Sequence, residues 1–590
     1  MTNIYFFKSS LLCLFIFICN IVTGQQIIDN KVKQFLIDQN KVECLITFHS
    51  DVVIPILSGI SKNEKGSIVF SILKKNTEKA QKEVIEYLTK NDIPYKSFSI
   101  VNMIYANINR EQANSLSQMS NVSGIQHNPQ VHLQKPIQIQ NSKEEDILVQ
   151  RSAGEPEWNI KAINADKVWD LGYEGEGVVI AGADTGIDFE NPLLIEKYRG
   201  PNANNQHGYH WHDAIHELSP LHEDPIISPE NNPCGFGLMA PCDDHGHGTH
   251  TMGTMVGSDG DNLIGVAPKA TWIGCRNMER GYGSPASYVE CFEWFLAPTN
   301  RLGEHPDPKL APHVINNSWS CPEMEGCNSS NWNVIETAVN NLRAAGIVVV
   351  VSAGNSGPDC STVSVPPSMF PNSFAVGATD INDDLAGFSS KGPVVSDGSG
   401  RLKPDVTAPG VNIRSAIIDN QFAAWSGTSM AGPHVAATVA LLIDANPNLG
   451  GEVDVIEDIL RSTAKFLIDT LDCGSISGSQ VPNNSFGYGR IDALAAVQKA
   501  LQTVSTTSNN NDISINLFPN PTTNKIQIRS NQALNGTLEL VNLEGKSCLT
   551  KPLNNLSLIE LDLSHLEAGS YLYYIQTAKA YKVGKIIKAE

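Results

Sequence analysis

Residues 177–188 read GVVIAGADTGID, a short apolar run rich in valine and isoleucine that stops at Asp184. Residues 346–357, GIVVVVSAGNSG, repeat the pattern before Asn355. Continuous apolar runs bounded by glycine predict strands that are buried on both faces, as in a parallel sheet. Helical segments alternate with such runs over residues 158–502, which predicts an α/β domain with helices on both faces of the sheet.

Polar residues follow both predicted strands, and function in open α/β sheets collects at the carboxyl ends of strands. Taken alone, Asp184 and Asn355 are equally well explained as turn residues. Residues 243–257, DDHGHGTHTMGTMVG, place His247 and His250 just before a helix-like run. The H-E-x-x-H pattern of zinc proteases is absent, because no glutamate lies between these histidines.

Residues 426–442, SGTSMAGPHVAATVALL, carry two serines ahead of a helix-like apolar run. Serine is a common helix cap, so either serine is explained without catalysis. Pro433 is tolerated only near a helix start, which predicts that the helix begins close to Ser429. A serine nucleophile needs a base and an orienting acid, which His247 and Asp184 could supply. The order Asp, His, Ser differs from that of lipases, and no G-x-S-x-G elbow surrounds Ser429.

These motifs, in this order, resemble the subtilisin family of serine proteases (subtilases), and specifically its bacillopeptidase F-like branch. The similarity covers about residues 158–500. Supporting matches are GVAPKATW, VINNSWS, FPNSFAVGATD, FSSKGPV, LKPDVTAPGV and FGYGRIDALAAV. The resemblance implies an endopeptidase with a subtilisin-like parallel sheet. A catalytically inactive adhesin and a lipase or esterase are the alternatives.

The resemblance also implies a role for each motif. Ser429 would be the nucleophile, His247 the general base and Asp184 the residue that orients the imidazole. The Asn355 side chain and the Ser429 N–H would form the oxyanion hole. His250 would be structural, and Ser426 a turn residue.

The resemblance places the substrate-binding residues on two segments and one loop. They are Ser318, Trp319, Ser320, Ser352, Ala353, Gly354 and Ser364. Ser356 and Ser364 match positions near the rim and floor of the first specificity pocket, and neither is charged. We therefore expect no strict preference for cleavage after Arg or Lys. Trp319 replaces the smaller residue that is common at this place in the family.

The remaining sequence predicts flanking units. The boundaries are a signal peptide at residues 1–24, an inhibitory propeptide at 25–134, a linker and maturation zone at 135–157, the peptidase domain at 158–502, a second linker at 503–512 and a C-terminal domain at 513–590. The propeptide shows strand-like residues 42–48 and 99–108 and helical residues 76–91 and 111–119, which resembles the ferredoxin-like α+β propeptide of subtilases. An uncleaved anchor is the alternative for the leader, and an unrelated binding domain for the propeptide.

The C-terminal residues contain LFPNPTTNKIQI and GSYLYYIQ and predict a small β-sandwich. They resemble the type IX secretion C-terminal sorting domain, which implies export through an outer membrane to the surface or beyond. A generic carbohydrate- or protein-binding sandwich is the alternative. Expected partners are protein or peptide substrates, the protein's own propeptide and the secretion machinery, with no transmembrane segment in the mature chain.

The 590-residue chain has a formal net charge of -20, which argues against nucleic acid as a partner. Close spacing makes Cys234/Cys242 and Cys321/Cys327 the natural disulfide candidates, although spacing leaves the connectivity of the eight cysteines from Cys234 to Cys473 open. The chemistry requires no cofactor. Structural calcium is a family expectation, for which Asp188, Asp213 and Asp224 are candidate ligands.

Overall fold

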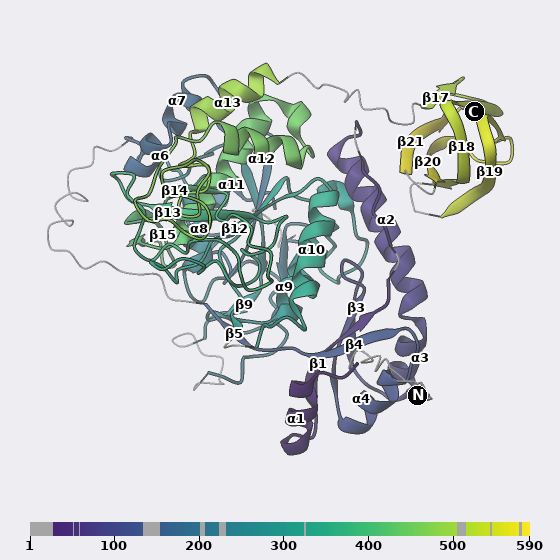
Figure 1. The fold of residues 1–590 in the computed structure, drawn as a ribbon, viewed down its shortest axis with the longest axis horizontal. Coiled ribbons are helices and arrows are strands. Elements are labelled where there is room, and N and C mark those ends of the chain that lie inside the picture. Colours follow the sequence, from purple (N-terminus) through teal and green to yellow (C-terminus); the bar gives the residue numbers. More distant parts are fainter. Residues whose placement is uncertain are drawn as a thin grey trace, which may run out of the picture.

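We describe the fold from a computed structural model. It describes residues 27–50, 52–57, 59–133, 154–200, 207–222, 232–323, 326–503, 515–542, 546–577 and 581–589. The predicted signal peptide lies outside these residues, as do most of the two predicted linkers. Figure 1 shows an N-terminal α+β unit, a large central α/β unit and a small C-terminal β unit. The predicted boundaries between these units remain predictions.

The central unit is built on seven parallel strands in the order β14-β13-β12-β11-β6-β8-β7. The strands are β6 Val179–Asp184, β7 Trp211–Asp213, β8 Thr271–Arg276, β11 Val314–Asn317, β12 Val348–Ser352, β13 Phe374–Thr379 and β14 Val406–Pro409. The predicted parallel sheet is therefore confirmed, and β6 and β12 lie where the two apolar runs predict strands.

Helices cover both faces of this sheet, as the continuous apolar runs predict. In β12, Val348 and Val350 pack into the core that contains α8 (His247–Val256) and α11 (Thr428–Ala445). Val349 and Val351 pack into the core that contains α9 (Pro285–Leu296) and α10 (Trp332–Ala344). Alternate residues of a strand face opposite sides, so a strand buried on both faces needs apolar residues throughout.

Two of the central α-helices, α9 and α13, begin at side-chain caps, and Asp492 caps α13. Ser284 caps α9, whose first residue is Pro285. The helices are α6 Trp158–Ala162, α7 Ala165–Trp169, α8 His247–Val256, α9 Pro285–Leu296, α10 Trp332–Ala344, α11 Thr428–Ala445, α12 Val453–Ser462 and α13 Ala493–Gln502, with 3-10 turns η1 Ile195–Lys197, η2 Pro308–Leu310 and η4 Pro447–Leu449. The short strands are β9 Met278–Glu279, β10 Tyr282–Gly283, β15 Ile413–Ala416 and β16 Phe422–Trp425.

The N-terminal unit, here called the N-terminal domain, has the βαββαβ order of a ferredoxin-like fold. Its antiparallel sheet has the order β2-β3-β1-β4. The elements are α1 Asn30–Asp38, β1 Val42–Phe48, α2 Lys62–Ala80, α3 Lys82–Lys90, β2 Tyr95–Phe98, β3 Met103–Ile108, α4 Arg110–Ser117, β4 Val122–His127 and β5 Val131–His132. The predicted α+β fold is confirmed.

Two predicted boundaries in this domain are wrong. Helix α2 begins at Lys62, well before residue 76, because Ser61 and Glu64 form a reciprocal capping box. Strand β3 begins at Met103, after residue 99, because Asn102 adopts a left-handed conformation and its N–H donates to the carbonyl of Ser99. Local side-chain and turn chemistry therefore decided both boundaries.

The C-terminal unit is an antiparallel β domain, which confirms the predicted all-β character. Its strands are β17 Ile515–Phe518, β18 Lys525–Asn542, β19 Ser547–Asp562, β20 Gly569–Thr577 and β21 Tyr581–Lys588. Strand β18 pairs with β17, β19 and β20, so the strands join into one sheet that curves around a shared apolar core.

Four disulfides lie in the central unit. The Cys234–Cys242 and Cys321–Cys327 bonds confirm the pairs predicted from close spacing. Cys275–Cys291 and Cys360–Cys473 join cysteines that only the fold brings together. Within the described residues, no helix combines the length and the apolar character that crossing a membrane requires.

Candidate active site

The carboxyl end of β6 and the start of α8 are packed unusually closely. A Cβ at Gly248 would lie 2.0 Å from the carbonyl oxygen of Gly186, so only glycine fits there. Gly246 precedes the helix with φ +88°, a conformation that favours glycine. These two glycines let the first turn of α8 rest directly against the residues that follow β6.

This packing brings His247 to Asp184. The Nδ1 atom of His247 lies 2.7 Å from Oδ1 of Asp184, and both side chains are buried. The carboxylate also accepts hydrogen bonds from the Thr185 N–H at 2.8 Å and from the Thr251 hydroxyl at 3.4 Å. With Nδ1–H donating a hydrogen bond to the carboxylate, Nε2 is the nitrogen left with a lone pair. Nε2 has no hydrogen-bond partner among the described residues.

Ser429 lies in the first turn of α11, where the sequence predicts the helix start. Pro433 has no N–H, so it cannot donate to the carbonyl of Ser429 four residues earlier. The hydroxyl of Ser318 donates to that carbonyl instead, at 3.0 Å. The Ser429 hydroxyl in turn donates to the carbonyl of Ser318 at 3.2 Å, and not to His247. Two contacts with Ser318 therefore hold the first turn of α11 against the end of β11.

Asn355 faces the same helix start. Its Oδ1 atom accepts hydrogen bonds from the Thr428 N–H and the Thr428 hydroxyl, both at 2.9 Å. The Thr428 hydroxyl also accepts from the Gly354 N–H at 3.2 Å. With its oxygen engaged, the amide presents its Nδ2 group as a donor beside Gly427. Thr428 is a positioning residue that the motif GTSMA contains but that the sequence analysis did not single out.

Replacing Asn355 with alanine is expected to lower kcat by about 10²–10³-fold, the range known for the equivalent loss of an oxyanion-hole side chain in subtilisin, and to change KM little. The donor would act on charge that develops only in the transition state. The Thr428→Val variant keeps the side-chain size and loses only the hydroxyl, so its kcat should fall less. Steady-state kinetics on a peptide substrate measures both. A loss confined to KM would contradict the assigned role.

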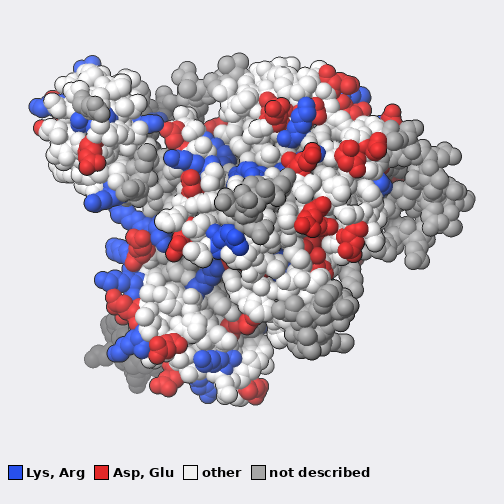
Figure 2. Space-filling model, turned by 180° about the vertical axis from the view of Figure 1, so that it is seen from behind, with Lys and Arg blue, Asp and Glu red and all other residues white. Residues whose placement is uncertain are grey.

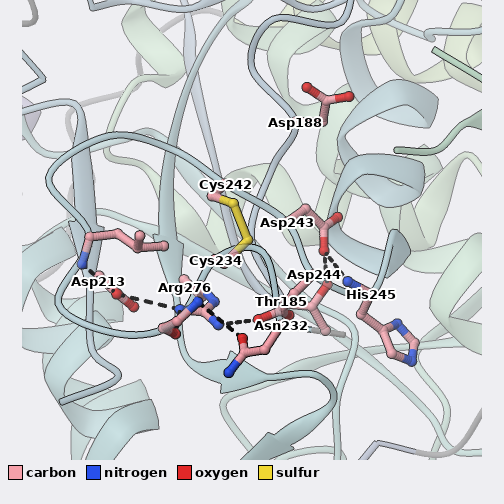
Figure 3. Close-up of a disulfide and its surroundings, with 12 residues drawn as sticks. Thr185, Asp188, Asp213, Asn232, Cys234, Cys242, Asp243, Asp244, His245 and Arg276 are labelled. Atoms are coloured by element: carbon pink, nitrogen blue, oxygen red, sulfur yellow. Dashed lines mark hydrogen bonds and ion pairs between the residues drawn. A yellow bond between two sulfur atoms is a disulfide. The ribbon is translucent and has the colours of Figure 1, made fainter. Parts of the chain in front are cut away.

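Asp243 is the second carboxylate that organises this site. Its Oδ1 atom accepts from the Thr185 hydroxyl and from the N–H groups of His245 and Gly246, at 2.9–3.0 Å. Its Oδ2 atom accepts from the N–H and the hydroxyl of Thr249, at 2.9 and 2.6 Å. Asp243 thus ties the residue after Asp184 to the turn that carries His247. Figure 3 shows Asp243 beside the Cys234–Cys242 disulfide.

A buried arginine supports the same loop. The Arg276 guanidinium pairs with Asp213 and with Asp244 and donates to the carbonyl of Gly235 at 2.9 Å (Figure 3). Burial raises the pKa of Asp244 to about 6, although Arg276 opposes this shift. Arg276 lies beside Asp184 in the sheet, so this cluster braces the loop from the strand next to β6.

We expect Asp243→Ala to reduce kcat by about 10–100-fold, since displacing a catalytic base by about 1 Å has an effect of that order. The variant leaves several N–H groups of the α8 turn without their acceptor. The matched control is Asp188→Asn, because the half-buried Asp188 lies near Asp243 and accepts none of these hydrogen bonds. Kinetics of both variants, with the melting temperature of each, separates a catalytic effect from unfolding. Equal losses in the two variants would contradict the assignment.

His250 is fully buried behind the site. Its Nε2 atom lies 3.0 Å from the carbonyl of Ile413 and 3.2 Å from that of Ala423, and its ring stacks on Trp425. Burial and the nearby His247 lower the pKa of His250 to about 3. These contacts agree with the structural role expected for it.

The predicted substrate-binding segments converge at the ends of β11 and β12. A Cβ at Gly432 would lie 3.9 Å from both the Ser318 and the Ser352 hydroxyl oxygens, so α11 begins above both segments. Gly354 has φ +110°, and a Cβ there would lie 2.9 Å from the hydroxyl of Ser390. Ala353 is buried, while Ser320 and Ser364 are half-exposed. Binding roles for these residues remain predictions.

Trp319 points away from the solvent. Its side chain is only 2% exposed, and its ring stacks on Tyr288 with centroids 3.8 Å apart and contacts Phe292. The bulky ring therefore packs behind the segment that follows β11, where it fills the core between β11 and α9.

The two described candidate calcium ligands, Asp188 and Asp213, lie apart (Figure 3). Asp213 pairs with Arg276, and Asp224 lies outside the described residues. Asp188 is half-buried beside Asp243, and burial and that neighbour raise its pKa. Within the described ranges, no group of three or more His, Cys, Asp or Glu side chains is arranged to hold a metal ion.

Comparison with known proteins identifies two regions of the chain. Residues 516–589 match the secretion system C-terminal sorting domain, which confirms the predicted export to the cell surface or beyond. Bacillopeptidase F of Bacillus subtilis (strain 168) is 39% identical over 449 residues, which cover 74% of this chain and 29% of that protein. The matched region thus spans less than a third of bacillopeptidase F.

Two other relatives match over a larger share of their own length. Subtilisin E of Bacillus subtilis (strain 168) is 29% identical over 362 residues, 61% of this chain and 74% of its own length. An alkaline protease of Shouchella clausii is 30% identical over 357 residues, 60% of this chain and 73% of its own length. The subtilase family itself matches residues 175–489, more than half of the chain, and this range includes every residue of the site described above. The chain belongs to the subtilase family.

Proposed function

We propose that the protein is an exported serine endopeptidase, made as a precursor that its own N-terminal domain inhibits. The observation that carries this proposal is the buried Asp184–His247 pair at 2.7 Å, with Ser429 and Asn355 held at the same edge of the sheet. Every group that acyl transfer requires is supplied by the chain itself, so the proposed chemistry uses no cofactor.

In the proposed reaction, the Ser429 hydroxyl leaves the Ser318 carbonyl and donates to His247 Nε2, whose lone pair is available. Ser429 Oγ then attacks the scissile carbonyl while His247 takes its proton, and the imidazolium is stabilised by Asp184. The carbonyl oxygen gains negative charge and is met by the Asn355 amide and the Ser429 N–H. His247 returns the proton to the leaving amine, and water hydrolyses the acyl-enzyme by the same steps.

A substrate-like segment already lies near this site. Strand β5 of the N-terminal domain pairs with β10 as an antiparallel strand, and the Leu133 N–H donates to the carbonyl of Gly281 at 2.7 Å. A Cβ at Gly281 would lie 3.5 Å from the His245 ring and 3.7 Å from Leu133, so this strand runs beside the catalytic histidine loop. A peptide substrate would add to β10 in the same way, which supports inhibition by occupation.

The N-terminal domain is also anchored outside this strand. The Glu293 carboxylate of α9 accepts the N–H groups of Ser99 and Ile100 at 3.1 and 2.6 Å. The Lys65 ammonium donates to the carbonyl of Gly451 at 2.8 Å and pairs with Glu452 at 2.7 Å. These contacts support a precursor in which the N-terminal domain stays docked until it is cut away.

Docking of the N-terminal domain is expected to tighten as the pH rises from about 7 towards 10. Lys62 is buried against the carbonyl of Ala311, and burial lowers its pKa from 10.5 to about 7. A depressed lysine pKa means that the docked state binds the proton more weakly than the undocked state does. Docking therefore releases a proton between about pH 7 and 10, and it tightens as the pH rises through this range. Inhibition constants of the isolated N-terminal domain, measured from pH 6 to 9, test this. Lys62→Met should flatten the profile relative to wild type, and an unchanged slope would contradict the assignment.

The decisive experiment is labelling with a fluorophosphonate probe, which reacts only with an activated serine. The mature wild-type protein should be labelled, and Ser429→Ala should not. An unlabelled, folded wild-type protein would favour an inactive adhesin. Hydrolysis of esters without cleavage of peptide bonds would favour an esterase.

The substrate pocket supports cleavage without a charge requirement, because Ser356 and Ser364 are uncharged. Profiling with a peptide library would overturn this if cleavage occurred only after Arg or Lys. Structural calcium remains part of the proposal, and comparing the melting temperature with and without a calcium chelator tests it.

A further inference from the structure

Strand β20 of the sorting domain is buried on both faces. The five residues Tyr571–Ile575 are all buried, although neighbouring residues of a strand point to opposite sides. Tyr571, Tyr573 and Ile575 pack into the domain's own core. Leu572 and Tyr574 lie on the outer face, yet they are only 7% and 8% exposed. Something outside the sorting domain must therefore cover that face.

The covered face extends onto β18. Val541 pairs with Leu572 and Glu539 with Tyr574, so these four residues share one side of the sheet. Val541 is buried as well. We call Glu539, Val541, Leu572 and Tyr574 the docking face. Its apolar members do not join the core of the sorting domain; they belong to the apolar cluster that includes the N-terminal domain.

Helix α2 is the element that meets this face. The Lys75 ammonium lies 3.0 Å from the Glu539 carboxylate, across 464 residues of sequence. Ile68, Val69 and Leu73 of α2 belong to the same apolar cluster as the docking face. Figure 1 shows the sorting domain beside α2, and Figure 2 shows it from behind, next to the basic side chains of the N-terminal domain.

The sequence supports a face that is covered in the folded precursor. The run YLYYI at residues 571–575 is continuously apolar or aromatic, as expected for a strand buried on both sides. In strand β19 of the same domain, exposed residues instead separate the buried Leu553, Ile559 and Leu561, and residues 559–562 show strict alternation. A face left open to water would show that alternation too.

We propose that helix α2 of the N-terminal domain is the docking partner of the sorting domain, and that the precursor therefore holds its export domain on its propeptide. Removal of the N-terminal domain then uncovers Val541, Leu572 and Tyr574 as an apolar patch. Maturation of the enzyme and presentation of this patch are thereby one event.

A carbodiimide, which joins a paired amine and carboxylate without a spacer, tests the contact in the full-length Ser429→Ala precursor. Mass spectrometry should find an amide bond between Lys75 and Glu539. The exposed Lys525–Glu560 pair, at 3.1 Å within the sorting domain, provides an internal reference for a folded domain. Leu572→Asp should lower the Lys75–Glu539 yield about tenfold, because a carboxylate replaces a buried leucine, and leave the reference unchanged.

The matched control is Leu558→Asp on β19, since Leu558 is 45% exposed and lies outside the docking face. It should leave both yields unchanged. The proposal is overturned if the Lys75–Glu539 product is absent while the reference forms, if Leu572→Asp leaves its yield intact, or if the yield rises with protein concentration, which would indicate contact between copies. None of these outcomes depends on catalysis, because the tested precursor lacks Ser429.

Discussion

Replacing Ser429 with alanine is expected to reduce kcat by about 10⁶-fold, the loss known for removal of the nucleophile in subtilisin, a member of the same family. The variant keeps the Ser429 N–H and the Asn355 amide, so weak residual catalysis above water should remain. It should also accumulate as the uncut precursor if maturation is autocatalytic. Steady-state kinetics and the mass of the secreted protein measure the two effects.

Ser426→Ala is the matched control for this prediction. Ser426 lies three residues before Ser429, and its hydroxyl accepts a hydrogen bond from the Asn412 N–H at 2.9 Å. This hydroxyl has no part in the proposed chemistry. We expect activity close to wild type from this variant. Loss of activity in Ser426→Ala with retention in Ser429→Ala would reverse the assignment of the two serines.

Asp184→Asn is expected to lower kcat by about 10⁴-fold, as for the equivalent change in other serine proteases, with little change in KM. An asparagine amide can donate to Nδ1 of His247, which would place the ring proton on Nε2 and remove the base that Ser429 requires. Thr251→Val removes the weak contact with Asp184 at 3.4 Å and the hydroxyl's contact with the Gly248 carbonyl at 3.1 Å, but it keeps the Asp184–His247 pair, so its effect should be much smaller. If Asp184→Asn kept activity within tenfold of wild type, the proposed triad would be wrong.

The sheet was predictable because its strands are buried on both faces. Such strands read as unbroken apolar runs, and the structure places β6 and β12 inside the two runs quoted from the sequence. The ends of α2 and β3 were not predictable from periodicity, because a capping box and one left-handed asparagine determine them.

The pairing of Asp184 with His247 was expected from the resemblance of the motifs to the subtilase family. The residues that hold this pair in place did not. Asp243 lies inside the quoted run DDHGHGTH, but its role depends on Thr185 and Thr249 reaching it from two different elements. Thr428 likewise becomes a positioning residue only because Asn355 arrives from the end of β12.

The sequence by itself determined the parallel sheet, the start of α11 close to Ser429 and shortly before Pro433, and the residue types that acyl transfer needs. These features depend on local pattern: strand burial, helix geometry and motif order. Tertiary structure alone decided which carbonyl accepts the Ser318 hydroxyl, how Arg276 braces the loop before His247 and what covers Leu572 and Tyr574. Each of these depends on groups tens to hundreds of residues apart, whose meeting is set by the packing of whole elements and not by any local pattern.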